Sequence, residues 1–208
     1  MPVGWVRDVE QGTNQPIFVE TDSGKRTYID PRLAFAVEDK PRNISEVRQR
    51  FDASSTAFQV LHGVDLSQKV AVVTGANTGI GFETAKSLAI FKCQVVLACR
   101  SEAAAEEAIQ KIAKDKPEAA DRCSFVQLDL TSLRSVQKCI HEMKARFNHI
   151  DLLILNAGVF ALPHTVTDDG LETIFQVSHL SHFYLTVSLE DRLDYTSRVI
   201  VVSSESHR

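Results

Sequence analysis

Short apolar runs alternate with longer segments of helical spacing from about residue 64 onward. Five runs have the length and near-continuous apolar character of buried strands, at 70–73, 94–98, 125–130, 151–155 and 198–202. The segments between them predict helices at 79–91, 102–114, 131 or 132 to about 147, and one long helix within 168–193. Strands that are apolar on both faces are typical of parallel sheets covered by helices. This part of the chain therefore predicts an α/β fold with a doubly wound parallel sheet.

The first 66 residues follow a different pattern. Residues 1–34 contain two or three short strand patterns and the single tryptophan of the chain. Residues 35–66 are mixed and charged, with a polar stretch at 52–56 and a short helical pattern at about 45–51. The sequence therefore predicts a small all-β domain at 1–34, a linker at 35–66 and a Rossmann-type α/β domain at 67–208.

The composition is that of a soluble globular protein, with 44% hydrophobic and 24% charged residues. A net charge of -4 gives no indication of binding to nucleic acid or to an anionic membrane surface. The four cysteines form no Cys-x-x-Cys pair, which favours reduced thiols and an intracellular compartment. The N-terminus lacks the apolar region of a signal peptide, and no apolar run approaches the roughly 18 residues that span a membrane.

A glycine-rich segment follows the first apolar run and opens onto a helical pattern. Gly75 lets the chain turn sharply, Gly79 lets the backbone approach a phosphate, and Gly81 lets the helix pack close to the sheet. This order of strand, loop and helix places the pyrophosphate of a dinucleotide on a helix N-terminus. The sequence predicts that the cofactor is bound here by Thr74, Gly75, Asn77, Thr78, Gly79, Ile80 and Gly81. The alternative, an ordinary tight turn, would not need three glycines.

The next two strands end in charged residues. Cys99 and Arg100 stand where an acidic residue would accept a hydrogen bond from the 2′-hydroxyl of a ribose. Because a guanidinium there can pair with a 2′-phosphate, the sequence favours NADP(H) over NAD(H). The alternative is a solvated charge at a strand end. Asp129 can accept from the adenine amine, or it can cap the following helix.

The last two strands end in small polar residues. Asn156, Ala157 and Gly158 are predicted to lie beside the cofactor, although Asn156 can also brace neighbouring strands. Ser204 can donate to a substrate carbonyl, and its alternative is a plain turn residue. His179 and His182 are three positions apart, but they have no acidic or cysteine partner at a useful spacing, so no metal site is predicted.

These residues, in this order, resemble the short-chain dehydrogenase/reductase family. The resemblance covers about residues 66 to 208 and rests on Thr74-Gly75-x-x-x-Gly79-x-Gly81, Asp129, Asn156-Ala157-Gly158 and Ser203-Ser204. It implies an oxidoreductase that moves hydride between a nicotinamide and a substrate carbon. In that family a serine polarises the carbonyl, a tyrosine transfers the proton and a lysine lowers the pKa of the tyrosine. Ser204 matches the serine.

Two departures from the family pattern stand out. Ser178 occupies the position where the family has an asparagine that supports a proton relay. The family's Tyr-x-x-x-Lys pair follows the serine strand, whereas this sequence ends four residues after Ser204. Tyr184 and Tyr195 precede that serine and have no lysine four residues on. We therefore expect an incomplete sheet, truncated after its fifth strand, without the tyrosine and lysine.

Residues 1–34 resemble a WW domain, a three-stranded sheet. Trp5, Phe18 and Pro31 match the residues that pack together in that family. The positions that normally hold a tyrosine, a histidine and a second tryptophan for proline-rich ligands are here Ile17, Thr21 and Tyr28. Since one aromatic ring of three remains, we expect weak or absent binding to Pro-Pro-x-Tyr segments and a role in folding or support.

A WW domain followed by a short-chain dehydrogenase/reductase resembles a small group of proteins that combine both. That resemblance implies a regulatory protein that binds protein partners and has a dehydrogenase domain, for which steroids and retinoids are the candidate substrates. It also implies a cytoplasmic location, with mitochondrial, Golgi or nuclear pools. The alternative from a different class is a non-catalytic binding module that acts through its partners or through a bound nucleotide.

Overall fold

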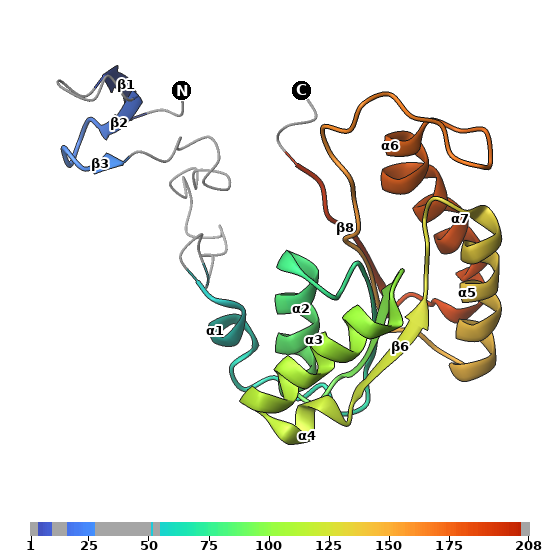
Figure 1. Ribbon diagram of the computed structural model, residues 1–208. Helices are drawn as coiled ribbons and strands as arrows, with labels where there is room; N and C mark the ends of the chain where they lie inside the picture. Colours follow the sequence, from blue (N-terminus) through green and yellow to red (C-terminus); the bar gives the residue numbers. More distant parts are fainter. Residues whose placement is uncertain (1–3, 10–15, 28–50, 52–54, 205–208) are drawn as a thin grey trace. The chain divides into compact units, whose positions relative to one another are not determined.

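The computed structural model describes residues 4–9, 16–27, 51 and 55–204 (Figure 1). The chain divides into two compact units, of which the larger runs from Leu61 to Ser204. Pro31 and Tyr28 of the expected WW domain lie outside the described residues, as does nearly all of the short helix expected at 45–51.

The N-terminal unit contains a three-stranded antiparallel sheet in the order β1-β2-β3. The strands are β1 (Trp5–Val9), β2 (Pro16–Glu20) and β3 (Arg26–Thr27). Trp5 pairs with Glu20, and Phe18 pairs with Thr27. Gly24 forms the turn into β3 with a φ of 69°, a conformation that glycine adopts without strain. This sheet agrees with the small all-β domain predicted from the sequence.

The larger unit is built on a five-stranded parallel sheet in the order β6-β5-β4-β7-β8. Its strands are β4 (Val70–Thr74), β5 (Gln94–Cys99), β6 (Cys123–Gln127), β7 (Leu152–Leu155) and β8 (Arg198–Val201). Val72 pairs with Val96 on one side and with Leu153 on the other. The strand order reverses between β4 and β7, so this is a topological switch point. The predicted parallel α/β sheet is confirmed.

One strand was predicted too far along the chain. The apolar run suggested a strand at 125–130, but β6 ends at Gln127. Asp129 accepts hydrogen bonds from both the backbone nitrogen and the hydroxyl of Thr131, which turns the chain away from the sheet. Leu128 and Leu130 are buried on either side of this turn, so their apolar character came from the core and not from a strand.

Helices cover both faces of the sheet (Figure 1). They include α2 (Gly79–Ile90), α3 (Glu102–Asp115) and α5 (Leu133–Arg146), and the chain also forms the short helices α1 (Ala57–Leu61) and α4 (Pro117–Ala120). Ser101 and Ser132 cap α3 and α5 with their hydroxyls. The short helices α1 and α4 were not predicted, and α1 lies within the segment expected to be a linker.

The long helix expected within 168–193 is shorter and is divided. It consists of α6 (Thr173–Phe175), a π-helical turn at Gln176–Leu180 and α7 (Ser181–Ser188), followed by a short 3-10 turn at Glu190–Arg192. A π-helical turn inserts an extra residue into a helix, and such turns often occur at functional sites. Apolar periodicity alone does not show this insertion.

The core has two layers, one on each face of the sheet. Val72, Val96 and Leu153 pack with residues of α5 and α7. Their neighbours along the strands, such as Val73 and Leu97, pack with α2 and α3 on the opposite face. Successive side chains along a strand point to opposite faces, and both faces are buried. The strands therefore have continuous apolar runs in the sequence.

Strand β8 forms one edge of the sheet. Its apolar side chains are partly accessible, with Val199 44%, Ile200 41% and Val201 64% exposed. Within the described residues, no helix has both the length and the apolar character needed to cross a membrane.

Candidate dinucleotide-binding site

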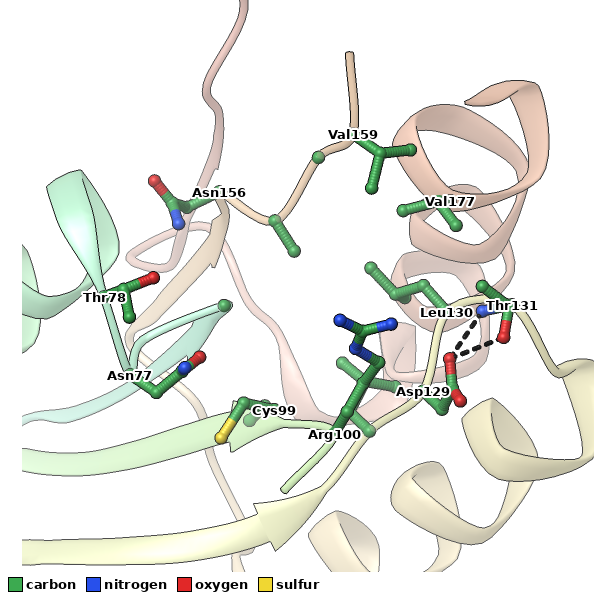
Figure 2. A pocket seen from close by; sticks show the side chains of 15 residues that line it. Asn77, Thr78, Cys99, Arg100, Asp129, Leu130, Thr131, Asn156, Val159 and Val177 are labelled. Carbon is green, nitrogen blue, oxygen red and sulfur yellow. Dashed lines mark hydrogen bonds between the residues drawn. The ribbon is translucent and has the colours of Figure 1, made fainter. Parts of the chain in front are cut away.

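A cleft of about 310 Å³ opens at the carboxyl ends of the central strands, next to the switch point (Figure 2). Its volume is within the range of small-molecule sites. The predicted cofactor residues that line it are Gly75, Asn77, Thr78, Arg100, Asp129, Asn156, Ala157 and Gly158. Residues that sequence reasoning did not assign to it include Cys99, Thr131, Val159 and Val177. Among the predicted residues, Thr74, Gly79, Ile80 and Gly81 do not line the cleft.

The three glycines of the loop are required for different reasons. Gly75 and Gly79 have φ values of 65° and 58°, which disfavour any other residue. A Cβ on Gly79 would meet no atom within 4 Å, so this backbone faces open space. A Cβ on Gly81 would lie 2.4 Å from Nδ2 of Asn156 and 2.5 Å from the carbonyl oxygen of Gly75. The loop therefore approaches the end of β7 too closely for a side chain at Gly81.

The loop leads into the N-terminus of α2. Thr78 is the N-cap residue, with an extended backbone, and its side chain makes no capping hydrogen bond. Backbone N–H groups in the first turn of a helix lack helical partners and attract anions. Beside the open backbone of Gly79, this arrangement fits a phosphate group.

Thr74 and Asn156 join the glycine loop to the end of β7. The Thr74 hydroxyl accepts hydrogen bonds from the backbone nitrogens of Asn156 and Ala157, both at 2.9 Å. The Asn156 amide nitrogen donates to the carbonyl oxygen of Thr74, also at 2.9 Å. Asn156 therefore braces neighbouring strands, the alternative considered for it, while it also lines the cleft. Thr74 is fully buried and supports the cleft from beneath.

His182 completes this network, and sequence reasoning missed it. Its Nε2 lies 3.0 Å from the Thr74 hydroxyl oxygen, and the residue is only 4% exposed. Burial lowers the pKa of His182 to about 4, so the imidazole is neutral at physiological pH. The position of His182 in a predicted helix gives no indication that its side chain contacts a threonine at the end of a strand.

Arg100 stands at the rim of the cleft. Figure 2 shows its side chain reaching into the opening from the end of β5. Among the described residues, none forms a hydrogen bond or an ion pair with its guanidinium. Burial raises the pKa of the neighbouring Cys99 thiol, so no thiolate competes with an incoming anion for the guanidinium. The arginine is therefore available to an anionic ligand.

Asp129 lies across the cleft from the glycine loop. Its carboxylate accepts from Thr131, and it does not cap α5, because Ser132 and Asp169 perform that function. The capping alternative for Asp129 is therefore wrong. Asp129 therefore holds the turn at Thr131 and also lines the cleft, and its predicted contact with the adenine amine stays a prediction.

The serines of interest occupy different places. Ser178 lies in the π-helical turn, with its hydroxyl oxygen 3.5 Å from the backbone nitrogen of Val159, beside the cleft. Ser203 and Ser204 follow β8 and are exposed, and they are not among the residues that line the cleft. Ser204, which is predicted to polarise a substrate carbonyl, therefore does not line the cleft.

The two histidines considered as metal ligands have different surroundings. The ring of His179 lies against that of Phe175, tilted by 45° with a centroid separation of 5.4 Å, while His182 contacts Thr74. Within the part of the chain that the structure describes, no group of three or more potential ligand side chains converges.

Replacing Gly81 by alanine tests the close approach of the loop and β7. In an ordinary helix the change from glycine to alanine stabilises a protein by about 0.5–1 kcal/mol. Here we expect the opposite sign, a loss of about 1–3 kcal/mol, because the new Cβ overlaps Asn156 and the Gly75 carbonyl. Urea unfolding measures the change, with Glu83→Ala in the exposed part of α2 as the control. A Gly81→Ala chain as stable as the unaltered chain would contradict this geometry.

The buried His182 predicts a particular dependence of stability on pH. In the unfolded chain the imidazole has its ordinary pKa of 6.5, whereas in the folded protein its pKa is about 4. Between these pH values the unfolded state binds a proton that the folded state does not. Stability should therefore fall as pH decreases from 6.5 to about 4, by at most on the order of 3 kcal/mol. Carboxylates whose pKa values are lowered, such as that of Asp151, lose their contribution to stability only when the pH falls below about 4. Unfolding curves at several pH values should show a flatter profile for His182→Gln, and an unchanged slope would refute the assignment.

Comparison with known proteins agrees with this geometry. The short chain dehydrogenase family matches residues 69–207. The chain is 57% identical over its full 208 residues to a WW domain-containing oxidoreductase of Drosophila melanogaster, and it covers 51% of that protein. It is 52% identical over 183 residues to the human protein of the same name, covering 87% of this chain and 44% of that one. The chain thus spans about half the length of these curated relatives.

Solved structures show the same fold. A protein from Mycobacterium paratuberculosis, 36% identical, superposes with a TM-score of 0.60 over 69% of this chain and 48% of its own. RhlG of Pseudomonas aeruginosa, solved with NADP in its active site, is 23% identical and gives a TM-score of 0.52 over 64% of this chain and 51% of its own. The family match, the identity across the whole chain and the glycine loop at the switch point lead to one conclusion: the chain belongs to the short-chain dehydrogenase family.

Proposed function

We propose that this chain forms the cofactor-binding part of an oxidoreductase that uses NADP(H) and transfers hydride to or from a carbonyl or hydroxyl carbon. One observation carries the proposal. The glycine loop up to Thr78, the N-cap residue of α2, and the Asn156–Gly158 segment border a single cleft, with an arginine free to pair at its rim. The bound cofactor would supply the hydride chemistry, and the chain would supply its binding and orientation.

The choice of NADP(H) over NAD(H) rests on Arg100. The carboxylate that would accept from a ribose hydroxyl is replaced at this strand end by a neutral thiol, Cys99, and the guanidinium beside it. A guanidinium binds a phosphate through two parallel hydrogen bonds and gains from both charges. RhlG, which shares the fold, has been solved with NADP, and this supports the same choice here.

The residues that we assign to the chemical step are not among those that line the cleft. We assign Ser204 to polarising the substrate carbonyl, and we place Ser178 where the family has its relay asparagine. In the family, a tyrosine and a lysine that follow the serine strand complete the reaction. Val159 and Val177 give one end of the cleft an apolar lining, which favours an apolar substrate and agrees with steroids and retinoids as candidates.

Exchanging the charge at Arg100 tests the cofactor choice. We expect Arg100→Asp to weaken NADPH binding by roughly 10- to 100-fold, because a charge-assisted pair is replaced by repulsion of the 2′-phosphate. NADH binding should change little or improve. Titration of cofactor fluorescence on the 208-residue chain measures both affinities, and Arg134→Ala on the exposed side of α5 is the control. An unchanged ratio of the two affinities would exclude this role, and no binding of either cofactor at millimolar concentration would refute the proposal itself.

A second function, protein binding by the WW sheet, is supported by the names of the relatives. We propose that it does not operate by binding Pro-Pro-x-Tyr segments. Ile17 occupies a position where that recognition uses a tyrosine, and it is only 5% exposed. An aliphatic, buried side chain offers no ring on which a proline can stack. The sheet is then a support for its neighbours or a surface for another kind of partner.

Peptide titration tests this second proposal. We expect titration with a Pro-Pro-x-Tyr peptide to show no saturation up to about 1 mM, because most of the stacking contacts are missing. The variant carrying Thr21→His and Tyr28→Trp should bind more tightly, since it restores the family's residue at two of the three recognition positions. Micromolar affinity of the unaltered chain would contradict the interpretation of these positions.

A further inference from the structure

Every hydrogen-bonding position of the Thr74 hydroxyl is used by a neighbouring group. The residue has no exposed surface, so water does not supply a partner. Its oxygen accepts from the backbone nitrogens of Asn156 and Ala157 at 2.9 Å each. A hydroxyl has two acceptor lone pairs and one proton, and both lone pairs are used here. The proton must therefore be directed to the third neighbour, Nε2 of His182 at 3.0 Å.

The hydrogen-bond partners of the Thr74 hydroxyl determine the tautomer of His182. If Nε2 accepts the hydroxyl proton, it cannot carry one of its own, and the ring proton sits on Nδ1. Burial lowers the pKa of His182, and a backbone hydrogen bond with Ser178, one turn earlier in the helix, opposes this shift, as a carbonyl that accepts a ring proton does. With Nε2 protonated instead, an N–H would face a hydroxyl whose lone pairs are already occupied. The buried pair therefore has one arrangement that satisfies every donor and acceptor.

The same contacts join four elements around the cleft. Thr74 ends β4, Asn156 and Ala157 follow β7, and His182 lies in α7 directly after the π-helical turn. Asn156 in turn packs so closely on the start of α2 that it excludes a side chain at Gly81. His182 is thus the link through which the helix bearing Ser178 contacts the network beneath the cleft.

We propose that His182 is a positioning residue for the dinucleotide site. By accepting the Thr74 hydroxyl proton, it leaves both lone pairs of that hydroxyl free to hold the amides of Asn156 and Ala157, which line the cleft. This inference rests on the proposed function of the cleft. Without an acceptor at His182, the hydroxyl proton would turn toward the two amide donors, and the end of β7 would lose its fixed place. A histidine that merely fills space would have none of these effects.

Nitrogen NMR of the unaltered chain tests the tautomer without any substitution. We expect His182 Nε2 to resonate as an unprotonated acceptor nitrogen and Nδ1 as a protonated one. A protonated Nε2 would overturn the proposal, because the Thr74 hydroxyl would then need a different arrangement. Because this measurement uses the unaltered chain, it determines the tautomer even if a variant at His182 does not fold.

Substitution tests the consequence for the cleft. We expect His182→Leu to weaken NADPH binding about tenfold and to speed the hydrogen exchange of the Asn156 and Ala157 amides selectively. His182→Gln, which offers an acceptor oxygen and a donor nitrogen, should remain within about threefold of the unaltered chain. Combining His182→Leu with Thr74→Val should cost no more than the larger single effect, since both remove the same link.

Ile112→Val is the control for a general loss of stability, because Ile112 is buried on α3 at the opposite face of the sheet. It should leave the two amides and the NADPH affinity unchanged. If His182→Leu binds NADPH and protects those amides like the unaltered chain, the positioning role is wrong. If the unaltered chain binds no NADPH, the proposed function fails, while the tautomer and the amide exchange still decide whether His182 orders the end of β7.

Discussion

The hydrogen bonds around the Thr74 hydroxyl are the constraint on which the cleft depends. They connect the end of β4 to the end of β7, two strands that are neighbours in the sheet but 82 positions apart in the chain. Adjacent parallel strands are held along their length by the ladder, but their ends are free to diverge. The hydroxyl stops that divergence at the point where the glycine loop must meet Asn156. The approach that excludes a side chain at Gly81 follows from this attachment.

The buried polar groups around the cleft are tolerated because they form hydrogen bonds with one another or with the backbone. Ser181 donates to the carbonyl of Leu130, and Gln176 donates to Asp169, which in turn accepts from the first turn of α5. Among the described residues, the buried side-chain atoms without a partner are the hydroxyl of Ser124 and Nε of Arg192, and both lie away from the cleft. A satisfied polar network specifies one arrangement, whereas a partly satisfied one would destabilise the fold. The π-helical turn carries Gln176 and Ser178 within this network.

Much of the fold followed from the sequence because its causes are local or periodic. The strands are apolar on both faces, and Ser101 and Ser132 cap the helices that follow them. The extent of β6 did not follow, since Leu128 and Leu130 are buried without being in a strand. At the cleft, the presence of Gly75 and Arg100 in the lining could be predicted from the sequence, whereas the contacts of Thr74 and Asp129 could not. A hydrogen-bonding side chain has the same identity whether it contacts a ligand or braces the backbone.

The sequence by itself determined the class of the sheet, the place of the glycine loop and the family, because periodicity and the special backbone freedom of glycine are properties of short segments. Only the tertiary structure decided that Thr74 lies outside the lining of the cleft, that Asp129 turns the chain at Thr131, and that His182 contacts Thr74. The contact of His182 with Thr74 spans 108 positions. Nothing in the local pattern encodes it, because it exists only once the sheet has brought the two strand ends against α7.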